Sequence, residues 1–117
     1  MVFPKSTKIW KETMDPYDKV DFKVNLTPVL GTTENVTSFT VVPLPEAELY
    51  GLTVGTGSYA PNIIDKFLTI WLFIAPAFQA DVAFVKGLTL PIEVSITTDS
   101  TPPRKKQRTV AVKVIQR

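Results

Sequence analysis

The chain has 117 residues, of which 44% are hydrophobic and 21% charged, with a net charge of +2. This length and balance predict one folded domain rather than a disordered segment, and so small a positive charge gives no reason to expect nucleic-acid binding. The absence of histidine and cysteine excludes the common catalytic triads and dyads, disulfides and the usual zinc sites. We therefore expect no catalytic residues, no cofactor and no metal ion, and the protein is predicted not to be an enzyme.

Residues 1–14 form a mixed, proline-containing N-terminal region. We expect an arm or an edge strand here, with Ile9 and Trp10 able to start the strand, and a single domain over residues 15–117. The first residues lack the apolar core of a signal peptide, and the longest mostly apolar stretch, residues 67–78, is too short to span a bilayer. The sequence therefore predicts a soluble protein made in a cytoplasm, with no membrane partner.

Three short strands are predicted in the first half of the chain. Apolar and polar residues alternate from Val20 to Leu26, which is the pattern of a half-buried strand. The run VTSFTVVPL at residues 36–44 predicts a second strand. A shorter strand is expected over residues 49–54, followed by a loop rich in glycine and proline.

The run KFLTIWLFI, residues 66–74, is the most informative stretch of the chain. Some of its apolar residues also recur at helical spacing, but its aromatic and β-branched content and the prolines on both sides favour a strand over residues 67–74. A short helical turn is expected before it, at residues 62–66. As a strand it is apolar on both faces, with leucines and isoleucines on one face. The other face carries three aromatic residues, Phe67, Trp71 and Phe73.

A small two-layer β domain buries only one face of such a strand in its own core. The aromatic face of Phe67, Trp71 and Phe73 is therefore a candidate protein interface. Two alternatives stay open at this point, because either the loop at Asn62 or residues 75–87 could fold over the face and cover it.

Two further strands are predicted near the end of the chain, where apolar residues alternate over residues 90–97 and 109–114. The stretch between them contains two prolines and suits a hairpin loop. This loop holds the densest charge of the chain, a candidate basic contact formed by Arg104, Lys105, Lys106 and Arg108. No aromatic residues are interleaved with these charges. We therefore expect a solvated hairpin tip or a protein docking point rather than a nucleic-acid contact.

The acidic residues are predicted to have structural roles. Asp15, Asp18 and Asp21 lie around a turn but lack the ligand pattern of a calcium loop, so we expect turn capping and a solvated strand face. Glu46 and Glu48 are expected to face solvent.

The chain shows about seven short strands separated by turns, and nearly a third of its residues are Val, Ile or Thr. These residue types favour strands. The spacing predicts a single all-β domain, an immunoglobulin-like antiparallel β-sandwich with an N-terminal arm.

Short motifs in the first half of the chain resemble those of small bacteriophage proteins. Asp15-Pro16 followed by DKVDFKV at residues 18–24 resembles their D-P-x-E-x-x-x-Y-x-x-D start. The segment LGTTENVTSFTV at residues 30–41 resembles their G-D-x-I-x-x-S turn into a strand.

The resemblance continues to residue 115. TIWL at residues 69–72 resembles the T-V-W-L strand of these phage proteins, and the basic connection ending in Arg108-Thr109 resembles their R-x-x-x-R-T hairpin. The chain departs from the pattern at residues 43–62, which form a longer connection here.

The resemblance implies a non-enzymatic structural component of a tailed-phage virion with an immunoglobulin-like fold. Our leading hypothesis is a capsid decoration or cement protein, a homo-oligomer located in the virion, whose partners are the major capsid protein or other virion proteins. A tail or head-to-tail connector component is the alternative within the same class. From the residues alone, a carbohydrate-binding module also stays open, because aromatic faces of β-sandwiches stack on sugars.

Overall fold

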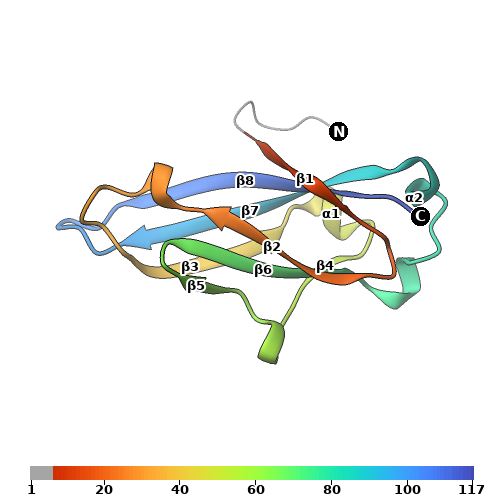
Figure 1. The fold of residues 1–117 in the computed structure, drawn as a ribbon, viewed down its shortest axis with the longest axis horizontal. Helices are drawn as coiled ribbons and strands as arrows, with labels where there is room; N and C mark the ends of the chain where they lie inside the picture. Colours follow the sequence, from red (N-terminus) through yellow and green to blue (C-terminus); the bar gives the residue numbers. More distant parts are fainter. Residues whose placement is uncertain (1–6) are drawn as a thin grey trace.

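Two sheets pack face to face in the computed structural model, which describes residues 7–117 (Figure 1). The first sheet has the strand order β1-β8-β7-β3, and the second has the order β2-β6-β4, with β5 also paired to β6. The predicted all-β class is confirmed in this form. The strands of the described residues are β1 (Lys8–Met14), β2 (Lys19–Asn25), β3 (Val36–Pro43), β4 (Leu52–Val54), β5 (Asn62–Ile64), β6 (Phe67–Ile74), β7 (Leu88–Thr98) and β8 (Lys105–Val114).

Short helical turns connect several of the strands. Two of them begin with proline and a third has proline at its second position, which fits the first helical turn because the missing N–H of proline has no partner there. Within residues 7–117, no helix has the length and apolar character needed to cross a membrane. The turns are η1 (Thr27–Val29), α1 (Pro45–Glu48), η2 (Gly57–Tyr59), η3 (Pro76–Phe78) and α2 (Ala83–Lys86).

The core lies between the two sheets and follows from the alternation of the strands. Every second residue of β6 is buried, and the same holds for most of β7 and for the second half of β8. The predicted strand over residues 67–74 is confirmed with these bounds. The central buried side chains are Leu68, Ile70, Leu72, Ile74, Leu90, Ile92, Val94, Val110, Val112 and Val114.

The other long predicted strands are also confirmed. The first alternating segment forms β2, and the run at residues 36–44 forms β3. The two final strands, β7 and β8, pair antiparallel as the predicted hairpin, and their register runs from Leu88 opposite Val114 to Thr97 opposite Lys105.

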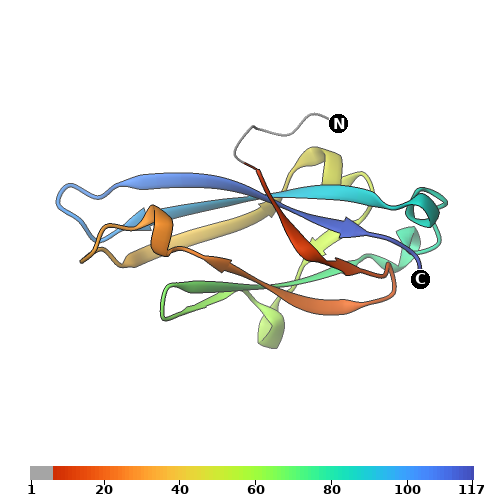
Figure 2. The ribbon, with the colours of Figure 1, turned by 45° about the horizontal axis from the view of Figure 1, so that its top comes forward.

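Residues 8–14 form an edge strand of the first sheet. β1 pairs in parallel with β8, with Lys8 opposite Val110 and Met14 opposite Val114. Its Trp10 and Met14 are buried in the core, and the chain then turns directly into β2 of the second sheet (Figure 2). Residues 1–6, the remainder of the predicted arm, lie outside the described residues.

The short helical turn expected at residues 62–66 is wrong. These residues form β5 and a tight turn, because Asp65 and Lys66 both adopt a positive φ, 51° and 66°. Two consecutive residues in this region make the hairpin turn that matches the twist of the flanking strands. The turn places Ile64 beside Phe67 in an antiparallel pair.

Candidate protein-binding surface

The outer face of β6 carries the three aromatic residues singled out from the sequence. Phe67, Trp71 and Phe73 alternate with the buried leucines and isoleucines and point away from the core. Phe67 is 43% exposed, and its neighbour Ile64 on β5 is 62% exposed. Trp71 and Phe73 are half-buried. The structure therefore brings the predicted residues together on one face and leaves this face only partly covered.

The cover over Trp71 comes from the connection between β4 and β5. The ring of Tyr59 in η2 packs edge-on against Trp71, with 5.1 Å between the ring centroids. Gly55 makes this approach possible, because a Cβ there would lie 2.5 Å from the carbonyl oxygen of Tyr59. The backbone N–H of Gly55 also donates a hydrogen bond of 2.8 Å to the Trp71 carbonyl. One of the two open alternatives, a cover from the loop at Asn62, is thus partly realised.

Lys19 fixes the position of this cover. Its ammonium group lies 3.9 Å from the ring centroid of Tyr59 and 4.9 Å from that of Phe73. A cation over an aromatic ring is attracted by the negative face of the π system. Lys19 therefore closes the Phe73 end of the face, while the end formed by Phe67 and Ile64 stays open. We call Phe67 and Ile64 the open apolar pair.

Polar residues of β2 border the aromatic face along one side. Asp21 lies opposite Trp71 in the register, Lys23 opposite Thr69, and Asn25 opposite Phe67. An apolar centre with a polar, charged border is the composition found in many protein interfaces.

The second alternative was that residues 75–87 cover the aromatic face, and the contacts of this segment show that it is wrong. Phe84 of this segment is fully buried, with its ring 6.4 Å from that of Tyr50. Phe78 packs beside Gly51, where an added Cβ would lie 2.6 Å from the ring. The segment closes one end of the sandwich because Phe84 enters the core there. Its Val82 and Val85 remain exposed.

The predicted basic loop is shorter than expected. The connection between β7 and β8 spans residues 99–104, and Lys105, Lys106 and Arg108 belong to β8, where they lie opposite Thr97, Ile96 and Val94. The reason is that the β-branched end of β7 continues the ladder beyond the predicted boundary.

The four basic residues do not form one patch. Arg104 lies 4.0 Å from the carboxylate of Glu34, the ammonium group of Lys106 donates to the carbonyl of Val29, and Arg108 donates to the carbonyl of Gln107. Lys105 points to the opposite face of the strand from Lys106, because successive side chains of a strand alternate. The contacts of Arg104, Lys106 and Arg108 are to oxygen atoms of the protein itself, and they give no support to a phosphate-binding role.

Glu34 is a buried carboxylate that ties the β2–β3 connection to the β7–β8 loop. Its Oε1 accepts a hydrogen bond of 2.6 Å from the backbone N–H of Gly31, and Glu34 is only 7% exposed. This hydrogen bond, aided by the hydroxyl group of Thr98, lowers the pKa of the Glu34 carboxyl below its ordinary value of 4.5. The residue was not singled out from the sequence, where an isolated glutamate in a loop gives no signal of burial.

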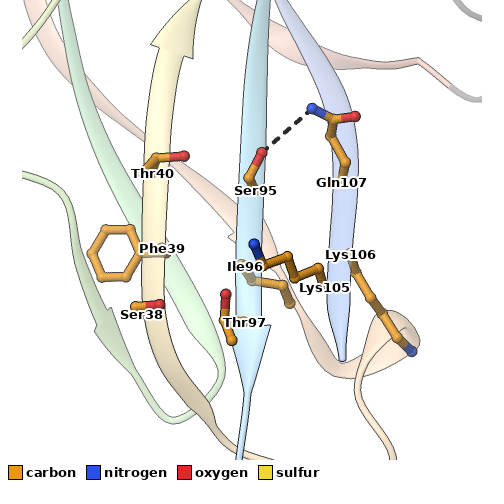
Figure 3. A pocket seen from close by; sticks show the side chains of 9 residues that line it. All are labelled: Ser38, Phe39, Thr40, Ser95, Ile96, Thr97, Lys105, Lys106 and Gln107. Atoms are coloured by element: carbon orange, nitrogen blue, oxygen red, sulfur yellow. Dashed lines mark hydrogen bonds between the residues drawn. The ribbon is translucent and has the colours of Figure 1, made fainter. Parts of the chain in front are cut away.

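A shallow groove of about 500 Å³ lies along β3, β7 and β8 on the first sheet (Figure 3). Hydroxyl groups, two apolar side chains and two lysines line it, and Gln107 donates a hydrogen bond of 3.5 Å to the Ser95 hydroxyl. In this view β3 is the outermost strand, and the ring of Phe39 lies on the side of β3 away from β7. The lining residues of β3 and β7 include Ser38, Thr40, Ser95 and Thr97.

The acidic residues of the β1–β2 turn and of α1 behave as the sequence predicts. Asp15 accepts the N–H of Tyr17 at 2.9 Å and Asp18 accepts the N–H of Asp15 at 3.0 Å, which confirms the predicted turn capping. Glu46 and Glu48 are exposed on α1, as predicted. Among residues 7–117, no three His, Cys, Asp or Glu side chains gather closely enough to hold a metal ion.

No protein-family model matches the chain, and no curated protein sequence matches it.

Proposed function

We propose that this protein is a non-enzymatic structural subunit that binds another protein through the outer face of the β2-β6-β4 sheet. The observation that carries the proposal is the open apolar pair, Phe67 and Ile64, which sits beside a bordering row of polar residues on β2. Aromatic side chains supply much of the binding energy in protein interfaces, where a polar rim surrounds them.

The strand order supports a further proposal, that the sandwich is immunoglobulin-like. In immunoglobulin domains, strands B, E and D share one sheet while C, F and G share the other. The order β2-β6-β4 corresponds to the first set, and β3-β7-β8 corresponds to the second. β1 then adds an extra strand beside β8, in parallel.

The assembly that we propose is the virion of a tailed phage, with decoration of the head as the specific role. The support for the virion is the sequence resemblance at residues 15–41 and 69–72. A role within an assembly is supported by the small size of the open apolar pair, which suits a contact that is repeated in many copies. Because Tyr59 covers Trp71, one contact of this size is weak, and many linked copies would supply avidity.

The carbohydrate alternative is less well supported by the geometry. A sugar stacks on the flat face of an exposed aromatic ring. Here Tyr59 packs against Trp71, and Lys19 lies over Tyr59 and near Phe73. The most exposed ring of the outer face, Phe67, is paired with an aliphatic residue, Ile64, which suits a protein partner better.

The proposal is tested by co-sedimentation of the purified protein with purified heads and with purified tails of the phage that encodes it. We expect binding to heads and its loss in the double variant Ile64→Ser, Phe67→Ser. The matched control is Val82→Ser, Val85→Ser, which changes two exposed apolar residues elsewhere and should leave binding intact. Trp71 is a poorer choice for substitution, because its loss also removes the packing of Tyr59.

Each outcome of this experiment has a meaning. Binding to tails alone would replace the head role by the tail role. Binding to neither structure would overturn the virion proposal, and equal loss of binding in both double variants would overturn the assignment of the surface. Circular dichroism and urea unfolding of both variants show whether the fold is retained.

A further inference from the structure

The free edge of β3 differs from the other sheet edges of the described chain. β3 ends the first sheet, and its eight residues, VTSFTVVP, include no charged side chain. The edge strands β1 and β2 carry lysines and acidic residues along their length, and β4 and β5 have only three residues each. Natural proteins protect exposed edges with charge, short length or bulges. The central part of β3 has none of these protections.

One hydrogen bond shows which backbone groups of β3 point away from β7 at this edge. The N–H of Leu44 donates to the carbonyl of Pro91 on β7 at 3.1 Å. Backbone groups of an antiparallel strand point alternately to the two sides, so those of Val42 and Thr40 also point toward β7. The N–H and C=O groups of Phe39 and Val41 therefore point to the free side.

The side chains of this edge are suited to pairing with a like strand. Phe39 and Val41 lie on the inner face of the sheet but are only half-buried, because β3 is the last strand. Thr40 is exposed on the outer face, and Val42 is 48% exposed. An added strand would bury more of Phe39 and Val41 without bringing any charged residue of β3 out of water.

We propose that the β3 edge binds the β3 edge of a second copy of this chain, antiparallel, around a two-fold axis at Thr40. In this register Phe39 lies opposite Val41 of the second copy, and Val41 opposite its Phe39. The four backbone groups of these residues in each copy then form four hydrogen bonds across the axis. The first sheets of the two copies become one continuous eight-stranded sheet.

A second copy fits this edge because the strand complements itself. The register pairs an aromatic residue with a β-branched residue on the inner face and threonine with threonine on the outer face, and both pairs stabilise antiparallel sheets. A symmetric contact of this kind closes on itself and does not propagate into fibres. It buries one strand edge per copy, less than the area of about 1,600 Å² in a standard interface. The dimer is therefore weak in dilute solution and forms at high local concentration.

The register is tested with single cysteines, since the natural chain contains none. In the proposed dimer the two Thr40 residues form a close pair that lacks backbone hydrogen bonds, with Cα atoms about 4.5 Å apart, within the range of disulfides. Thr40→Cys should become a disulfide-linked dimer under mild oxidation of concentrated protein. Gln107→Cys, exposed on the same sheet but away from the edge, is the matched control and should stay monomeric.

Two further cysteine variants distinguish this register from any other. Ser38 faces Val42 of the second copy, so Ser38→Cys and Val42→Cys should each stay monomeric alone and should cross-link when mixed. Cross-linking of Thr40→Cys at the level of the control, or no heterodimer in the mixture, would overturn the proposal.

A charge experiment tests the contact without cysteine. Thr40→Lys and Thr40→Glu should each be monomeric at concentrations where the natural chain dimerises in sedimentation velocity, and their mixture should dimerise again. Gln107→Lys is the control for added charge and should dimerise like the natural chain. A natural chain that stays monomeric at the highest soluble concentration, or variants that dimerise unchanged, would contradict the proposal. All these experiments use purified protein alone, so their result is independent of the virion proposal.

Discussion

The indole N–H of Trp10 donates a hydrogen bond of 2.9 Å to the backbone carbonyl of Lys23. The donor belongs to β1 in the first sheet and the acceptor to β2 in the second. The ring of Trp10 also stacks on Phe22, with 4.7 Å between centroids. Trp10 thus links the two sheets at the side where the chain crosses between them. Its hydrogen bond also satisfies a backbone carbonyl at the free edge of β2.

Replacing Trp10 by phenylalanine is expected to lower the free energy of unfolding by about 1 kcal/mol, because the hydrogen bond is lost while the ring contact is largely kept. Trp10→Ala should cost about 3 to 5 kcal/mol, because it also opens a cavity. Urea unfolding measures both values. A phenylalanine variant that unfolds at the midpoint of the natural chain would show that the hydrogen bond adds no stability.

The two faces of β6 should respond differently to truncation. Ile70→Ala removes a fully buried side chain and should cost about 2 to 5 kcal/mol of unfolding free energy. Phe67→Ala, on the half-exposed outer face, should cost about 1 kcal/mol or less. Equal costs in urea unfolding would mean that the outer face belongs to the core and is not available to a partner.

Replacing Lys66 by glycine should stabilise the β5–β6 turn. Lys66 adopts a φ of 66°, a conformation that costs a residue with a side chain roughly 1 kcal/mol and costs glycine little. Thermal unfolding should show a rise in melting temperature of about 4 °C. Lys105→Gly, in the extended backbone of β8, is the control and should lower the melting temperature. A decrease for both variants would contradict the turn geometry.

The stability of the protein should depend on pH through Glu34. Because its pKa is lowered in the folded state, mainly by the Gly31 N–H, ionised Glu34 stabilises the fold above its ordinary pKa of 4.5, and this contribution is lost as the pH falls through the lowered value. Glu34→Gln should therefore unfold at lower urea concentration than the natural chain at neutral pH, and the difference should shrink in acid.

Urea titrations from pH 7 to about pH 2 measure this effect. Glu46→Gln, exposed on α1, controls for the loss of a carboxylate elsewhere and should show no such convergence. A difference between Glu34→Gln and the natural chain that stays constant over the whole range would show that the ionisation of Glu34 is not coupled to folding.

The strands could be predicted from the sequence wherever one face is buried. In β6 the alternation of Leu68, Ile70 and Leu72 with bulkier aromatic residues determines the strand and its two faces, because the period of side chains in a strand is two. The same alternation of apolar and polar residues in the sequence also predicts β2, β7 and β8.

The cover of the aromatic face could not be predicted in the same way. It depends on Tyr59, which lies in a loop whose path no periodic pattern describes, and on the space that Gly55 leaves for it. The β5–β6 turn was missed for a related reason. Asp65-Lys66 lacks the glycine that usually marks such a turn, and a positive φ at lysine leaves no trace in the sequence.

The parallel pairing of β1 with β8 joins the first described strand to the last. On the ribosome, β1 emerges long before its partner β8 is made, so Trp10 and Met14 have no complete core to enter until β8 has left the exit tunnel. The sandwich therefore closes only after β8 has been synthesised. Pairing between strands so far apart in sequence is also expected to make folding slow, in the millisecond to second range.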